Sequence, residues 1–293
     1  MKFLLNGYTG YATIGGYPTL MTSFSMSKTE NILESGGIGD ILSNNAFTRY
    51  KLNAVRDYPS YELSISCEAS KTLLDYLFKK ITNKHHSFIS VSFKDDANGI
   101  SHSFSDCCLT SLQLSVDLNS AATISIGFQV FTDTIGISFG NHDSKKKNNA
   151  NSDLVGAVLM PYYRWGVEYP DFTDSDLVGF SISYSQSVTP KFGCYASNSE
   201  NAVKPKKIIF GLPTVTYELT YIVYNKTSTN YYSINSNNIA NSSKTLKVKY
   251  NNGFSFEMTN CYPNSYSPQY ANSGDVNKAT ISGTCYGKIQ YNN

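Results

Sequence analysis

Short sequence matches recur along the chain at a nearly constant separation, and this recurrence constrains the fold more than any other feature. FSMS at Phe24 returns as FSIS at Phe180, and YELSI at Tyr61 returns as YELTY at Tyr217, both 156 residues further on. Three more matches follow in the same order: VSF and VKY at Val91 and Val248, NGIS and NGFS at Asn98 and Asn252, and ATIS at Ala122 and Ala279. Five collinear matches near one offset indicate an ancient internal duplication.

A polar segment marks the boundary between the two copies. Residues 141–155 begin with NHDSKKKNNANSD, a run of Asn, Ser and Lys without hydrophobic periodicity, which is typical of a linker. Its three lysines are interpreted as part of a solvated loop rather than as an anion site. The predicted domains therefore cover residues 1–140 and 156–293, and each is large enough to enclose its own core.

Apolar and polar residues alternate with a period of two in both copies, which predicts strands with one buried and one solvated face. The segment SKTLLDYLFKKI (Ser70–Ile81) differs, because its apolar residues have helical spacing and Ser70 can cap the N-terminus. The second copy has a Ser- and Asn-rich stretch there, which we interpret as a loop. We predict a mainly β protein with two tandem, similar antiparallel β-sandwich or barrel domains and a flanking helix at about residues 70–81 in the first.

The residues expected to face the core within these strands are Tyr61, Leu63, Ile65 and Cys67, then Leu112, Leu114, Val116 and Leu118, then Ile124, Ile126, Phe128 and Val130, and in the second copy Leu246, Val248, Tyr250, Phe254, Phe256 and Met258.

Each copy also contains a long segment of poor periodicity after its first strands, at residues 32–60 and 188–207. Long loops inside compact domains usually serve function or form interfaces. The first segment carries Ile38, Ile41, Leu42 and Phe47 without an obvious local core. We predict that these four residues form a self-assembly interface. The alternative is a flap that covers its own barrel.

Charge and hydropathy narrow the range of partners. Only 16% of the residues are charged and the net charge is +2, so the chain has no basic excess with which to bind nucleic acid. No apolar run approaches the length of a membrane span, and the apolar start of MKFLLNGYTG is too short for a signal peptide. We therefore expect no membrane segment and no export, with the six cysteines reduced and half-buried in a cytosolic product.

The stretch KDDANGISHSFSDC (Lys94–Cys107) looks the most like a metal or catalytic site. A calcium loop with Gly99 at its sixth position would need ligands where Lys94 and Ser105 stand, so the pattern fails. The second copy reads VKYNNGFSFEMTNC here and keeps only Asn-Gly, the alternation and the Cys. We interpret the stretch as a hairpin with a two-residue type I′ turn and solvated aspartates at its tip.

Other catalytic patterns are missing from the sequence. His142 lies in the linker, His85 and His86 are adjacent in a predicted turn, and His102 lies in a strand, either on the solvent face or at a satisfied core position. No HExxH, CxxC, GxSxG or phosphate-binding glycine motif occurs. We expect no catalytic residue, no cofactor and no metal, and therefore a protein that is not an enzyme.

The organisation as a whole resembles the tandem-domain tail tube proteins of long-tailed bacteriophages and related contractile injection machines. Two similar β-domains in tandem, a helix after the YELSI strand, a long early segment in each copy and the missing active site carry this resemblance. It implies a virion structural protein of the tail, made in the host cytoplasm. Such chains self-assemble as homo-oligomeric rings, for example trimers with pseudo-sixfold symmetry, that stack into a tube. Sheath, tape-measure and baseplate proteins would be its partners, and DNA only its non-specific cargo.

Two other functions fit the same sequence. One is a non-catalytic β-sandwich binding module, in a tail fibre, an adhesin or a carbohydrate-binding protein that uses surface tyrosines. The other is a different structural subunit of a tail or capsid. Self-assembly into rings separates the first prediction from a monomeric binding module.

Overall fold

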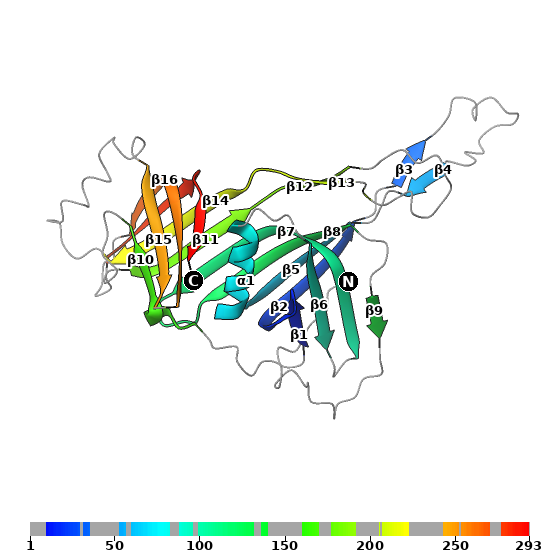
Figure 1. Cartoon of the computed structure of the whole chain (residues 1–293), viewed down its shortest axis with the longest axis horizontal. Helices are drawn as coiled ribbons and strands as arrows, with labels where there is room; N and C mark the ends of the chain where they lie inside the picture. Colours follow the sequence, from blue (N-terminus) through cyan, green and yellow to red (C-terminus); the bar gives the residue numbers. More distant parts are fainter. Residues whose placement is uncertain are drawn as a thin grey trace, which may run out of the picture.

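The computed structural model describes residues 10–29, 32–35, 53–56, 60–82, 88–95, 99–131, 136–139, 160–169, 177–191, 205, 207–222, 243–251, 253–269 and 277–292. Within these ranges the chain is mostly strand with a single α-helix, α1, which confirms the mainly β prediction. Figure 1 shows two groups of strands side by side with α1 between them.

The elements up to residue 139, here called the first half, are β1 (Gly10–Ile14), β2 (Tyr17–Thr29), β3 (Ile32–Ser35), β4 (Asn53–Arg56), β5 (Ser60–Glu68), α1 (Lys71–Thr82), β6 (Ile89–Asp95), β7 (Ile100–Asp117), β8 (Thr123–Phe131) and β9 (Gly136–Phe139). The elements from residue 160 onward, the second half, are the 3-10 helix η2 (Tyr162–Arg164), β10 (Trp165–Glu168), β11 (Leu177–Ser185), β12 (Val188–Lys191), β13 (Lys207–Phe210), β14 (Thr214–Ile222), β15 (Lys244–Tyr250), β16 (Phe254–Gln269), β17 (Lys278–Cys285) and β18 (Ile289–Asn292).

Six strands of the first half form a closed cycle of antiparallel pairings. The cycle runs β7-β6-β1-β2-β5-β8, and β8 pairs with β7 again. The second half runs β10-β15-β16-β17-β14-β11, and no pairing joins β10 to β11 among the described residues. Trp165 of β10 instead packs edge-on against Phe180 of β11, with ring centroids 5.6 Å apart. The gap between β10 and β11 in the second half is therefore closed by side-chain packing, whereas in the first half β1 and β2 are joined by backbone hydrogen bonds.

The strand pairings of the two halves follow one scheme. Seven pairings of the first half have a counterpart in the second: β1–β6 and β10–β15, β2–β5 and β11–β14, β5–β8 and β14–β17, β6–β7 and β15–β16, β7–β8 and β16–β17, β7–β9 and β16–β18, and β3–β4 and β12–β13. The pairing of β1 with β2 has no counterpart among the described residues. The registers differ. Phe24 lies opposite Ile65, but Phe180 lies opposite Leu219 rather than Tyr221, the position that an offset of 156 indicates. A shift of two keeps the same side chains on the core face; the duplication itself stays a prediction.

The two segments expected to be long loops each begin and end in a strand. β3 pairs with β4, and β12 pairs with β13, so both segments carry a hairpin at their base. Both hairpins extend beyond the main groups of strands (Figure 1). Ile38, Ile41, Leu42 and Phe47, the predicted assembly residues, lie outside the described residues.

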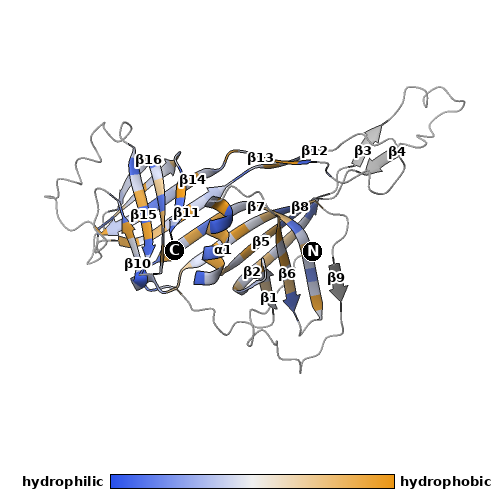
Figure 2. Ribbon diagram, in the orientation of Figure 1, coloured by the Kyte–Doolittle hydropathy of each residue, from blue (hydrophilic) through white to orange (hydrophobic). Residues whose placement is uncertain are grey.

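The predicted alternation matches the observed burial along the strands, as the hydropathy colouring also shows (Figure 2). Ile65, Leu114 and Ile126 are all at most 1% exposed. Leu118 is an exception, because β7 ends at Asp117 and leaves its side chain 46% exposed. Buried residues of both halves belong to one continuous cluster.

Helix α1 forms where the sequence predicts it and packs across the two halves. Ser70 caps it, since its Oγ accepts a hydrogen bond from the Leu73 N–H at 3.4 Å. On its buried stripe, the ring of Phe78 stacks on Phe256 of β16 with centroids 4.6 Å apart. The Tyr291 hydroxyl of β18 donates a hydrogen bond to Asp75. The helix of the first half is thus held by strands of the second.

The stretch Lys94–Cys107 is a hairpin, as predicted, but its turn is longer. The last pair of the hairpin is Asp95 with Ile100 in the first half and Tyr250 with Phe254 in the second. Four and three residues therefore separate the paired strands, where the sequence predicted two. Asp95 also contradicts the expectation of solvated aspartates, because its side chain is completely buried.

Candidate assembly surfaces

Eight strands from both halves lie side by side in the order β2-β5-β8-β7-β11-β14-β17-β16. Their side chains that point away from the core are mostly Ser and Thr, and the pairing registers align them in rows. One row contains Ser23, Ser66, Ser125, Gln113, Ser183, Thr216 and Thr284. A second row contains Glu68, Thr123, Ser115, Ser181, Glu218, Ser282 and Ser265. We call the surface formed by these two rows the hydroxyl face.

Neighbouring hydroxyls of this surface bond to one another. The Oγ atoms of Ser66 and Ser125 are 3.2 Å apart, and those of Ser265 and Ser282 are 2.7 Å apart. Cross-strand hydroxyl pairs of this kind stabilise a sheet modestly. Because most side chains of the face are short hydroxyls, few long or mobile groups are available to hold a ligand. The face is therefore polar and uniform.

The hydroxyl face is poor in positive charge. Within the eight strands, only Lys28 and Lys278 are basic, and both lie near strand ends. Glu68 and Glu218, by contrast, lie within its second row. Basic residues concentrate on other elements instead, such as Lys79 and Lys80 on α1 and Lys244, Lys247 and Lys249 on β15. The face therefore offers a polyanion no cluster of positive charge to bind.

A hollow of about 460 Å³ opens on the same side of the sheet, over β2, β5, β7 and β8. Ser25, Ser64 and Glu62 are part of its polar lining. Gly127 is also part of the lining, and a Cβ there would clash with the Ser111 Oγ. The lining offers hydroxyls and one carboxylate, but no histidine or cysteine that could serve as a nucleophile or base.

A strand pairing joins the two halves at the middle of the face. Residues 179–185 of β11 lie antiparallel to residues 111–117 of β7, with Ile182 opposite Leu114. Backbone bonds extend the joint at both ends: the Gln186 N–H donates to Thr110 O at 2.8 Å, and the Ala122 N–H donates to Met160 O at 2.9 Å. The hydroxyl face therefore crosses from one half to the other without a break.

The two ends of this eight-strand sheet have open edges. From residue 20 onward, β2 pairs with β5, and no second strand pairs with it in the described part of the chain. Beyond Cys261, β16 pairs with β17 alone, by the same restriction. Their counterparts in the pairing scheme, β11 and β7, cover each other at this place.

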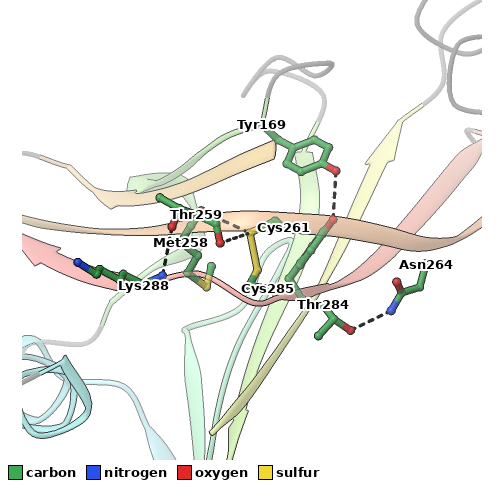
Figure 3. Close-up of a disulfide and its surroundings, with 9 residues drawn as sticks. Tyr169, Met258, Thr259, Cys261, Asn264, Thr284, Cys285 and Lys288 are labelled. Atoms are coloured by element: carbon green, nitrogen blue, oxygen red, sulfur yellow. Dashed lines mark hydrogen bonds between the residues drawn. A yellow bond between two sulfur atoms is a disulfide. The ribbon is translucent and has the colours of Figure 1, made fainter. Parts of the chain in front are cut away.

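The sulfur chemistry differs from the sequence prediction. Cys261 and Cys285 form a disulfide between β16 and β17, which corrects the expectation that all cysteines are reduced (Figure 3). The register places them directly opposite each other, with Cα atoms 4.0 Å apart. Cys67 and Cys108 are buried free thiols, and burial raises the pKa of each to about 12. They stay protonated at neutral pH, so neither is a reactive nucleophile.

His102 occupies a core position, the second of the two alternatives that its place in a strand left open. Its side chain is 2% exposed and stacks against Phe24 and Phe93, with centroids 6.4 and 6.0 Å away. Burial lowers the pKa of its imidazole. The histidine is thus part of the packing beside the open edge of β2.

No group of three or more His, Cys, Asp or Glu side chains in the described ranges is arranged to hold a metal ion. Over the same residues, no helix is long and apolar enough to cross a membrane. No family model matches the chain, and no curated protein matches it.

Proposed function

We propose that this protein is a structural subunit that assembles with copies of itself into rings, and that stacked rings form a tube lined by the hydroxyl face. The observation that carries the proposal is this face, which is continuous over eight strands and both halves. Antiparallel sheets commonly have one polar face toward water, but that role does not require side chains as short and uniform as these. The wall of a channel does, because its contents must slide without being bound.

The chemistry of the face supports duplex DNA as the content. A passage for DNA must avoid lysine and arginine, since each such contact with phosphate releases counterions and adds affinity. The eight strands carry basic residues only at Lys28 and Lys278. The tail tube of a bacteriophage or a related injection machine is the assembly that this role fits best, with sheath, tape-measure or baseplate proteins as neighbours. The proposed role requires no catalytic site.

The dimensions of the sheet are compatible with such a channel. Neighbouring strands lie about 4.8 Å apart, so eight strands span about 38 Å. Three copies would give a wall roughly 115 Å around, with an opening roughly 37 Å across between opposite backbones. Side chains narrow that opening, but Ser and Thr narrow it less than any other polar residues.

Negative-stain electron microscopy of the purified protein tests the assembly, with rings or tubes as the expected result. A concentration-independent monomer that binds glycans would contradict it and favour the binding-module alternative. Accessibility tests the lining. A biotin-maleimide attached to Ser183→Cys should bind streptavidin in the monomer but be shielded in tubes. Thr245→Cys, an exposed position on β15 outside the face, is the matched control and should bind in both. Equal streptavidin binding at Ser183→Cys in monomers and in tubes would show that the hydroxyl face does not line the channel.

A further inference from the structure

We infer that the open edge of β2 in one copy pairs antiparallel with the open edge of β16 in the next copy, and so repeats between chains the β11–β7 joint within the chain. The inference rests on the self-assembly part of the proposed function and specifies its contact. The occupant of each open edge is a second copy of this chain. The internal β11–β7 joint shows how these two kinds of edge fit together.

The counterparts are fixed by the pairing scheme. β2 corresponds to β11, because each pairs on its other side with the strand that carries the YELSI or YELTY motif. β16 corresponds to β7, because each pairs with the preceding strand of its hairpin and with the strand that follows it. At the middle of the sheet β7 covers β11, whereas the equivalent edges of β2 and β16 lie at opposite ends of the sheet.

The internal register predicts the register between chains. Carrying β11 back by 156 residues and β7 forward by 154 residues, the FSMS and NGIS offsets, converts the pair Ser183–Gln113 into Ser27–Ser267. The same step converts Ser185–Ser111 into Thr29–Ser265. All four predicted partners are exposed in the single chain. Their pairing continues the hydroxyl face from one copy to the next.

The core side of the same edges supports the pairing. The central buried pair Ile182–Leu114 becomes Met26–Pro268 in the predicted register. Met26 and Pro268 are both half-buried in the single chain, so each has apolar surface that a neighbour can cover. Phe24, also half-buried, lies two residues from Met26 on the same face of β2. The edges thus match in polarity on both faces.

Proline limits what else can pair with β16. Cys261 and Cys285 lie opposite with Cα atoms 4.0 Å apart, which identifies a non-hydrogen-bonded pair. Pro268 lies opposite Ala279, an even number of residues from Cys285, so its nitrogen also faces the open edge and offers no N–H. The edge therefore lacks a backbone donor at Pro268, so an unrelated strand pairs with it less readily. This protects a monomer from aggregation. The joint between chains has fewer backbone bonds available than the internal one.

The contact is heterologous, because β2 and β16 are different surfaces of the same chain. Each copy therefore offers one edge to each neighbour, and a constant rotation closes a ring. Joints within and between chains alternate around that ring, so all halves hold nearly equivalent positions.

Disulfide cross-linking tests the register. The double variant Ser27→Cys with Ser267→Cys, oxidised in the assembled state, should give covalent dimers and longer ladders on a non-reducing gel. Ser183→Cys with Gln113→Cys is the positive control and should cross-link within the chain, leaving a monomer band. Ser27→Cys with Thr245→Cys is the negative control, because Thr245 is exposed but lies on β15 and not at the open edge of β16.

The outcomes separate this inference from the proposed function. If the Ser27–Ser267 pair cross-links no more than the Ser27–Thr245 pair while rings are visible by microscopy, the edge pairing is wrong and the assembly uses another surface. If the wild type forms no oligomer at all, the proposed function fails and the edge pairing fails with it. Cross-linking that requires the Ser27–Ser267 pair supports both.

Discussion

Ile182 of β11 lies directly opposite Leu114 of β7, and this pair is the centre of the joint between the two halves. Both side chains are buried, with 4% and 1% of their surface exposed. They belong to the same continuous core as the strands on either side. The halves are therefore joined by packing as well as by backbone bonds, and we expect them to unfold together.

Ile182→Ala tests this joint. Removing a buried Ile side chain typically costs about 2–5 kcal/mol of unfolding free energy, through lost burial and the cavity left behind. Urea unfolding followed by fluorescence and by circular dichroism should show one shared transition at a lower midpoint. Ser183→Ala, the neighbour on the hydroxyl face, should change stability by less than about 0.5 kcal/mol. Two separate transitions in the wild type would show that the halves are independent.

Phe78→Ala tests the contact between α1 and the second half. Phe78 is 4% exposed and stacks on Phe256, so its truncation should cost about 3–5 kcal/mol. Lys79→Ala is the control, because its side chain on the opposite face of the helix is exposed and should have little effect. Thermal melting measures both. Equal melting temperatures for the two variants would mean that the helix does not depend on this contact.

The Cys261–Cys285 disulfide should stabilise the second half. The cysteines are 24 residues apart, and closing a loop of that length constrains the unfolded chain by about 3–4 kcal/mol. A reductant should lower the melting temperature of the wild type. The double variant Cys261→Ala with Cys285→Ala should start lower and not respond to the reductant. A wild type that ignores the reductant, while its thiols titrate as free, would contradict the pairing.

Because His102 is buried, we expect the folded protein to lose stability in mild acid. Burial lowers its pKa in the folded protein, so the unfolded chain binds a proton more readily. Its contribution is fully present above the unfolded pKa of about 6.5 and is lost as the pH falls through the folded pKa. Unfolding free energies at pH 7.5 and pH 5.5 should therefore differ more for the wild type than for His102→Phe. Identical differences would exclude this histidine as the source.

The segment that carries Ile41 and Phe47 remains a predicted assembly interface. Ile41→Asp and Phe47→Asp should each block assembly and leave a folded monomer, because a buried carboxylate would disrupt an apolar contact between copies. Sedimentation velocity measures the assembly, and circular dichroism checks the fold. Normal assembly of both variants would exclude these residues from the interface.

The sequence predicted what local physics decides. Alternation identified the buried faces of Ile65, Leu114 and Ile126, and the helical spacing behind Ser70 identified α1, because these patterns depend only on neighbouring residues. Asp95 was placed wrongly at a solvated tip, since the loop length that decides its position depends on the pairing of β6 with β7.

The features that remained hidden all depend on register between distant strands. Cys261 and Cys285 meet only because β16 pairs with β17 in one particular alignment. The joint of Ile182 with Leu114 brings together residues from different halves, and no spacing along the chain indicates it. The Ser and Thr of the hydroxyl face are visible in the sequence, but their alignment into rows is not. A repeat search predicts which strands correspond, and only the pairing shows which edges are left open.

Helix α1 also has a consequence for the order in which the chain can fold during synthesis. The Tyr291–Asp75 hydrogen bond joins residues 216 positions apart, and Phe78 packs on Phe256. When a ribosome has made the first half, Phe78 still lacks Phe256 and Asp75 still lacks Tyr291, so α1 has only its contacts with the first half, such as that of Tyr76 with Tyr17. The side of the helix that carries Phe78 stays uncovered until β16 and β18 emerge, late in the synthesis of the second half. A copy that met such a chain early would meet a subunit without β16, so the proposed edge pairing can form only after most of the second half has been made.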